Sequence, residues 1–285
     1  MLVYVAAFVG LFYLLCWYRE RQVVSHLQDK YVFILDMRGL RVLAACLTEE
    51  GTVILDVTQT ESIAAAAQWV KECVGDRGLW GLVNNAGTSF PSAPNEWLNK
   101  QDFMNILNVN LLGVIEVTLS LLSLVRKAQG HVVNVSSIMG WLSSYIGGYC
   151  MESFLDSLRR ELSCFGVKVP IIEPGFFKPN VSSSKTFMPS LKKGWDQSIS
   201  EFKEIYGEKF LEIYLKYPHL LEKVWTSDLS SVTDCMEHAL TACHLRTRYS
   251  AGWDVKLFYL PLSYVPTFPV DALVPLCSPK PAQAL

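Results

Sequence analysis

The sequence predicts an α/β fold with a doubly wound parallel sheet, and the alternation of its segments carries this prediction. From residue 52 onward, short runs rich in Val, Ile and Leu alternate with longer segments of helical period. Strands and helices in alternation produce a parallel sheet with helices on both faces. Hydrophobic residues make up 51% of the 285 residues, enough for a large buried core. The net charge of −2 gives no indication of a nucleic-acid partner.

Residues 1–18 form a nearly unbroken apolar and aromatic run, which is closed by Arg19-Glu20-Arg21. A helix of this length spans roughly 27 Å, close to the thickness of a thin hydrocarbon core. A cleaved signal peptide is the alternative, but it would carry its charges before the run and small residues at its end. We therefore expect residues 1–18 to be an uncleaved membrane anchor and residues 19–29 to be a linker. The basic flank after the run favours a body that faces the cytosol.

The first strands of the expected sheet follow one another too closely for a parallel arrangement. Residues 31–35 and 41–46 both have strand-like sequences, and a third such run, 52–57, follows soon after. A parallel crossover needs a dozen or more residues, usually including a helix. We therefore expect these strands to pair antiparallel, or one of them to leave the sheet. In either case the N-terminal strand–helix–strand unit is truncated.

The rest of the expected α/β domain, residues 30–260, has a regular order. Helices are expected at 61–74, 100–127, 151–165 and 229–244, and strands at 80–85, 131–135, 168–172 and within 248–260. Asn110 and Gly113 interrupt the second helix. The irregular residues 179–226 form an insertion that we expect to cover the ligand crevice, although a surface hairpin without ligand contact is the alternative. The apolar, proline-punctuated residues 261–285 are too broken to span a bilayer, and we expect a membrane-associated tail.

Two hydroxyl-bearing side chains indicate a catalytic pair. Ser136-Ser137 follows the strand 131–135, and Tyr149 lies about a dozen residues later. The serine could donate to a substrate carbonyl oxygen, and the tyrosine could move the proton that accompanies hydride transfer. A phenol with a pKa near ~10 needs a nearby cation to work at neutral pH, and on a helix that cation belongs four residues on. Ser153 occupies that position, so the expected cation is missing.

A second motif, Asn84-Asn85-Ala86-Gly87, follows another expected strand. Small residues there let the backbone approach a flat, charged ligand closely, although the motif alone could be an ordinary turn. Together with Asp56, Asn110, the Ser137–Tyr149 pair and Pro174-Gly175 it forms an ordered set. This set closely resembles the short-chain dehydrogenase/reductase family, and residues 78–87 and 246–254 most resemble its membrane-anchored retinol and 3α/17β-hydroxysteroid dehydrogenases.

The resemblance implies a Rossmann-like fold and a role for each motif residue. It makes Tyr149 the acid/base, Ser137 the group that holds the substrate carbonyl, and Asn110 the anchor of a proton-relay water. It places Asp56 at the adenine of NAD, with Asn84, Ala86, Gly87, Pro174 and Gly175 also contacting the cofactor. It further implies a retinoid or steroid substrate, attachment to the endoplasmic reticulum membrane and a homodimer. No metal site is expected, because the cysteines and histidines share no ligand spacing.

Three departures separate the chain from this family. The glycine-rich loop and helix after the first strand are missing, the second crossover helix is missing, and the Tyr-x-x-x-Lys motif lacks its lysine. Alternative exons, a decayed gene copy or an error in the assigned exon structure of the gene would each give this pattern. The sequence thus leaves two hypotheses: an impaired NAD-dependent retinol or hydroxysteroid dehydrogenase, and a non-catalytic family member that keeps the anchor and a lipophilic pocket.

Overall fold

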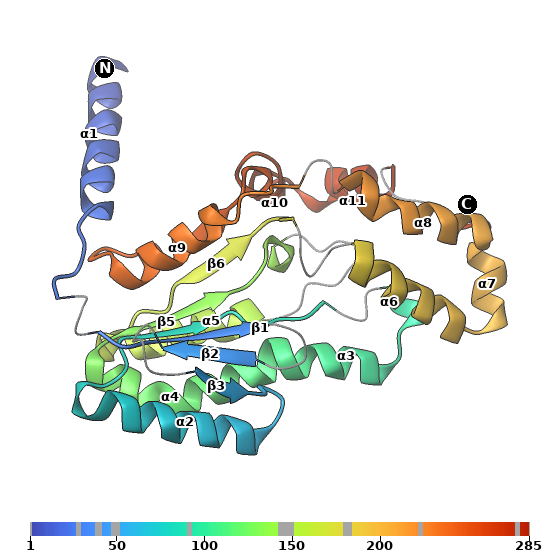
Figure 1. Cartoon of the computed structure of the whole chain (residues 1–285). Helices are drawn as coiled ribbons and strands as arrows, with labels where there is room; N and C mark the ends of the chain where they lie inside the picture. Colours follow the sequence, from blue (N-terminus) through green and yellow to red (C-terminus); the bar gives the residue numbers. More distant parts are fainter. Residues whose placement is uncertain are drawn as a thin grey trace.

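Seven strands form one sheet through the described part of the protein, in the order β3-β2-β1-β4-β5-β6-β7 (Figure 1). The computed structural model describes residues 2–26, 30–37, 42–46, 52–89, 93–141, 151–178, 184–221, 225–276 and 280–284. The strands are β1 (Val32–Met37), β2 (Val42–Cys46), β3 (Thr52–Leu55), β4 (Gly81–Asn84), β5 (His131–Val135), β6 (Ile171–Pro174) and β7 (Arg248–Ala251). β1, β4, β5, β6 and β7 pair in parallel, which confirms the predicted doubly wound sheet.

The reversed strand β2 marks the truncated N-terminal unit. β2 pairs antiparallel with β1, with Met37 opposite Val42, and antiparallel with β3, with Val42 opposite Leu55. The expectation of antiparallel pairing is therefore confirmed. Only residues 38–41 separate β1 from β2, which is too short for a parallel crossover. Because β2 is reversed against both neighbours, β3 runs in the same direction as β1.

Helices cover both faces of the sheet (Figure 1). They are α2 (Thr60–Val74), α4 (Val114–Ala128) and α5 (Met151–Leu162) on one face and α9 (Ser230–Thr241) on the other. Side chains alternate along each strand. Phe33 and Leu35 of β1 therefore pack under α2 and α4, whereas Val32 packs under α9. This two-sided burial is what the alternation of strands and helices predicts.

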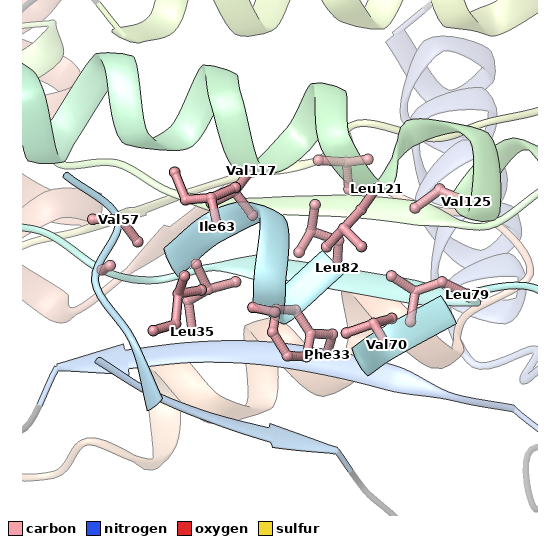
Figure 2. Packing of buried hydrophobic residues seen from close by; sticks show 14 of the residues in the cluster. Phe33, Leu35, Val57, Ile63, Val70, Leu79, Leu82, Val117, Leu121 and Val125 are labelled. Carbon is pink, nitrogen blue, oxygen red and sulfur yellow. The ribbon is translucent and has the colours of Figure 1, made fainter. Parts of the chain in front are cut away.

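The larger hydrophobic cluster lies between the sheet and helices α2 and α4 (Figure 2). Val117, Leu121 and Val125 recur at four-residue spacing along α4, and each is at most 2% exposed. Phe33 and Leu82 belong to the same cluster from β1 and β4. Full burial of one such side chain stabilises the fold by about 1.5–3 kcal/mol. The cluster therefore fixes α4, and with it the preceding turn, against the sheet.

That preceding turn is a short π-helical segment, Asn108–Gly113 (the π turn), which joins α3 (Lys100–Leu107) to α4. It is the interruption that Asn110 and Gly113 predict. A Cβ on Gly113 would lie 2.8 Å from the carbonyl oxygen of Val57, so glycine allows the turn to approach the chain beyond β3. Among the described residues, the stretch Lys100–Ala128 is long and apolar enough to cross a membrane. Its buried row on α4 makes it a core helix of the sheet domain instead.

The remaining helices lie outside these layers. They are α1 (Leu2–Glu20), α6 (Ser184–Gln197), α7 (Ser200–Tyr206), α8 (Glu208–Leu221), α10 (Leu260–Ser263) and α11 (Thr267–Leu276), with a further π turn at Val255–Tyr259. α6, α7 and α8 form the described part of the expected insertion. Trp195, Tyr206 and Phe210 from these helices surround Trp97, with ring centroids 5.1 to 6.0 Å away. The insertion therefore has an aromatic core of its own.

Candidate active site at the carboxyl edge of the sheet

The loops that follow the parallel strands meet at one edge of the sheet, where open α/β sheets bind their ligands. Asp56 follows β3, the Asn84-Asn85-Ala86-Gly87 motif begins at the last residue of β4, and Ser136-Ser137 follows β5. Gly175 follows β6. The fold therefore brings these predicted site residues to the same edge. Tyr149 belongs to residues 142–150, which lie outside the described part of the chain.

Ser137 presents a hydroxyl group at this edge. Its backbone is extended, with φ −155° and ψ 154°, and it caps the short 3-10 turn Ile138–Gly140. The Met139 N–H donates to the Ser137 Oγ at 3.2 Å. This bond uses an acceptor position of the hydroxyl, so the Ser137 O–H remains able to donate to a ligand oxygen. The half-buried side chain suits a role as donor to a carbonyl.

Asn110 holds the loop after β4. Its Oδ1 accepts from the Thr88 N–H at 2.8 Å, and its Nδ2 donates to the Thr88 carbonyl at 2.7 Å. A Cβ on Gly87 would lie 3.7 Å from Asn110 Oδ1, an ordinary contact distance. The π turn thus fixes the backbone of the Asn84-Asn85-Ala86-Gly87 loop through one amide side chain. π turns occur often at functional sites.

Asn84 and Ala86 lie mostly inside the protein. Asn84 is 2% exposed, and its Nδ2 donates to Thr118 Oγ1 at 3.0 Å and to Asn134 Oδ1 at 2.8 Å. These bonds link β4 to α4 and β5, so the Asn84 side chain holds the sheet together. A ligand at this loop would meet backbone groups of Asn84 rather than its amide.

Asp56 fixes the turn after β3. Its Oδ1 accepts from both the backbone N–H and the hydroxyl of Thr58, at 2.9 and 2.7 Å, and its own N–H donates to Ser62 Oγ. The carboxylate therefore holds the turn between β3 and α2 through Thr58. The Oδ2 atom is the part of this side chain that could accept from a bound ligand.

A buried carboxylate, Asp254, supports the loop after β6. The Phe176 N–H donates to Asp254 Oδ2 at 2.9 Å, and the Gly175 N–H donates to the Ala251 carbonyl at 2.9 Å. Asp254 is 9% exposed, and a Cβ on Gly175 would overlap its carboxylate. Pro174-Gly175 is therefore a close-approach position, and glycine is required there because Asp254 fills the space.

A cluster of charged side chains adjoins the serine pair, which it contacts through Ser136. Arg248 of β7 contacts Glu152 Oε2 at 2.6 Å and Asp156 Oδ2 at 3.4 Å, both on α5, and also contacts Glu173 of β6. The Trp141 Nε1–H donates to Glu173 Oε1 at 2.7 Å, and the guanidinium lies over the Trp141 ring at 4.7 Å. One cation thus ties α5, β6 and the chain after Ser137 together.

Burial governs the titration of this cluster. Glu173 is 1% exposed, and desolvation raises the pKa of its carboxyl above the ordinary value. Hydrogen bonds from Trp141 and Arg248 lower that pKa, but they do not offset the burial. The cluster reaches the carboxyl edge of the sheet through Ser136, whose hydroxyl donates to Glu152 Oε1 at 3.2 Å. Sequence reasoning missed these residues, because Arg248 lies 96 positions from Glu152 and no local pattern joins them.

The residues at this edge fit a nicotinamide dinucleotide only in part. In doubly wound folds the pyrophosphate binds to a glycine-rich turn and a helix N-terminus after the first strand. Here only four residues separate the end of β1 from the antiparallel strand β2, too few for the crossover helix that would carry such an N-terminus. Asp56, after β3, and the Gly175 loop, after β6, remain at this edge of the sheet. The described residues after β1 therefore do not match the site that a pyrophosphate requires.

Comparison with known proteins assigns this arrangement to a family. The family model described as short chain dehydrogenase matches residues 31–189. The chain is 62% identical over 317 residues to the human protein named retinol dehydrogenase 16, and 54% identical over 319 residues to human 17-beta-hydroxysteroid dehydrogenase type 6. Each match covers all of both chains. Because the first alignment runs over 317 positions and this chain has 285 residues, at least 32 positions of that relative have no counterpart here.

Solved structures share the fold. A short-chain dehydrogenase from Streptomyces avermitilis superposes with a TM-score of 0.55 at 22% identity, over 78% of this chain and 76% of that one. A structure described as NAD+-bound xylitol dehydrogenase superposes with a TM-score of 0.51 at 16% identity, over 70% of this chain and 76% of that one. The sheet order, the full-length relatives and the family model agree. The chain belongs to the short-chain dehydrogenase family.

Proposed function

We propose that this protein is a retinoid or hydroxysteroid oxidoreductase whose NAD-dependent turnover is impaired. The observation that carries the proposal is the Ser137 hydroxyl, which stands at the carboxyl edge of the sheet with its proton able to donate. The names of the relatives, retinol dehydrogenase and 17-beta-hydroxysteroid dehydrogenase, support the substrate class. We further propose that α1 anchors the protein in the endoplasmic reticulum membrane with its body facing the cytosol, and that it forms a homodimer.

The proposed chemistry uses the chain's own hydroxyl groups. Ser137 donates a hydrogen bond to the alcohol or ketone oxygen of the substrate and fixes its position. Tyr149 exchanges a proton with the same oxygen, and Asn110 holds a relay water through the backbone of its π turn. Ser153 supplies no cation to lower the pKa of the phenol. Loss of one general acid/base or donor group costs about 10²–10³ in rate, so several losses together give slow turnover.

The hairpin of β1 and β2 favours a second candidate function. It removes the helix end that would bind the pyrophosphate, while the Ser137 edge remains. A non-catalytic member of the family would bind a lipophilic alcohol or ketone and return it unchanged. Its site would use the same serine as a hydrogen-bond donor.

Turnover and binding assays on the full chain separate these two functions. The full-length protein in microsomes would be given NAD and either all-trans-retinol or a 3α-hydroxysteroid, with Ser137→Ala and Tyr149→Phe as controls. We expect slow product formation that both substitutions abolish. Saturable retinoid binding without product would contradict the oxidoreductase and support the second candidate. Equal product from the parent and both variants would contradict the assigned roles of Ser137 and Tyr149.

A further inference from the structure

The anchor helix α1 is attached to the body by a defined set of contacts. Its last residue, Glu20, forms an ion pair with Arg246, with Arg246 Nε 2.8 Å from Glu20 Oε1. His238 Nε2 lies 2.8 Å from the Glu20 carbonyl, and His238 Nδ1 lies 2.9 Å from the hydroxyl of the buried Tyr249. Since a carbonyl only accepts, Nε2 carries the proton in this arrangement.

The backbone after α1 continues this attachment. The Val24 N–H donates to the Thr241 carbonyl and the Cys243 N–H donates to the Gln22 carbonyl, both at 2.7 Å. Val23 and Ala242 form an antiparallel bridge between these two bonds. Residues 20–24 therefore bind to the connection between α9 and β7. These bonds fix the direction of α1 relative to the body. If α1 lies in a membrane, its direction therefore sets which face of the body meets the bilayer.

An exposed apolar surface lies on the segment that follows β7. Its members are Trp253 (52% exposed), Leu257 (75%), Phe258 (50%), Tyr264 (74%), Val265 (40%) and Phe268 (76%). Val255 and Val270 of the same segment are buried and hold it on the body. Across residues 253–270 the exposed charge is Lys256, because the second charged residue, Asp254, is buried. Large aromatic and aliphatic side chains with one lysine are typical of a segment that lies in a membrane interface.

The helices of this segment lie on the side of the molecule toward which the anchor points (Figure 1). Figure 1 shows α10 and α11 along the margin of the molecule from which α1 projects. The surface also adjoins the candidate active site. The ring of Tyr264 lies 6.5 Å from that of Trp141, in the chain after Ser137, and the ring of Tyr259 lies 5.8 Å from that of Phe176, next to Gly175.

We propose that the exposed side chains of residues 253–268 are a second membrane-contacting surface, which the bonded anchor holds against the bilayer. The partner of this surface is the interfacial region of a lipid bilayer. α1 supplies the attachment, and the short proline-rich helices supply a face that enters the bilayer without crossing it. This inference rests on the proposed membrane attachment of α1, and it is independent of turnover.

Photo-crosslinking from the lipid side tests the proposal. The full chain would be reconstituted in phosphatidylcholine vesicles that contain a lipid with a diazirine in its acyl chain, and the crosslinked peptides would be identified by mass spectrometry. We expect crosslinks on α1 and on the peptide containing residues 253–268. Crosslinks on α1 alone would overturn the surface, including the case in which a second copy or another protein covers it. Absence of crosslinks on α1 would contradict the membrane anchor itself.

Matched variants make the test specific. The double variant Leu257→Glu/Phe268→Glu should lower the crosslinking of the 253–268 peptide several-fold and leave α1 labelled. Leu119→Glu, at a 56% exposed position of α4 on the opposite face of the sheet, should change neither. Glu20→Arg should also lower the 253–268 signal, and Glu20→Arg/Arg246→Glu should restore it. An unchanged signal in Leu257→Glu/Phe268→Glu would overturn the proposal.

Discussion

Charged side chains from distant parts of the chain form a bonded cluster next to Ser136 and Ser137. Arg248 bonds to carboxylates on α5 and β6, and Glu173 is the most deeply buried of these. Breaking such a pair by removing one partner leaves an uncompensated charge and is more costly than neutralising it. The cluster therefore predicts a difference between two substitutions at the same position.

Glu173→Gln should change how stability depends on pH. A carboxyl whose pKa is raised by folding binds its proton more tightly in the folded state. Its contribution to stability is complete below the ordinary pKa of 4.5 and is lost as the pH rises through the higher folded pKa. The glutamine variant lacks this loss but keeps an acceptor for Trp141 and Arg248. The free energy of unfolding, measured in detergent, should therefore shift in favour of the variant as the pH rises above 4.5.

Glu173→Ala is the control for that experiment. It removes the acceptor of the Trp141 N–H and one partner of Arg248, so it should cost about 1–3 kcal/mol at both ends of the pH range. Parallel stability curves for the parent and Glu173→Gln would show that the buried carboxyl does not titrate as described.

The place of a residue in the fold could be predicted best where neighbouring residues define its position. Gly175 directly follows β6 and Ser137 is the second residue after β5, so both lie at the carboxyl edge as strand ends require. The tertiary partners could not be predicted in the same way. Asp254 bonds to Phe176 across 78 positions, and only the folded chain brings them together. The strand sequence likewise gave no sign that the Asn84 amide would be buried against Thr118.

At the scale of elements, the spacing between strands predicted the main departure of this sheet. Two strands separated by a few residues either pair antiparallel or do not both stay in the sheet, and β1 and β2 pair antiparallel. The break in the long helix at Asn110 and Gly113 was also visible in the sequence. Its form as a π turn was not, because the approach of Gly113 to Val57 comes from packing rather than from helix propensity.

Restoring the missing elements should restore cofactor affinity. A Thr-Gly-x-x-x-Gly-x-Gly loop and helix inserted between β1 and β2, together with a second crossover helix inserted between β2 and β3, would let β2 run parallel. The first insert would place a helix N-terminus after β1. Two regained charge-assisted hydrogen bonds, each worth about 1.5–3 kcal/mol, should raise NAD affinity about 10²-fold or more. Fluorescence titration with NAD would measure the change.

An insert of the same length with its glycines replaced by valine is the matched control. Valine side chains would block the approach of the pyrophosphate to the backbone, so this insert should restore little affinity. Equal NAD affinity of the glycine and valine variants would show that the missing glycine loop is not the cause of weak NAD binding.

For the whole molecule, the loss of at least 32 positions relative to a full-length relative has a visible structural consequence. α2 covers β3 from one side through Leu55, which is 1% exposed, while the neighbouring Ile54 is 61% exposed. Side chains alternate along a strand, so Ile54 points to the opposite face. The crossover helices missing from the sequence would lie near this edge in the family pattern. The sheet order survives their loss, because β1 still pairs with β4 in the core.

We propose that this member of the family keeps the candidate site residues at the carboxyl edge of the sheet but lacks the position that binds the pyrophosphate. Equilibrium binding of NAD to the full-length protein in detergent, followed by calorimetry, tests this claim most directly. We predict no saturation in the micromolar range, and a dissociation constant of about 1 mM or weaker. Saturable micromolar binding would contradict the account.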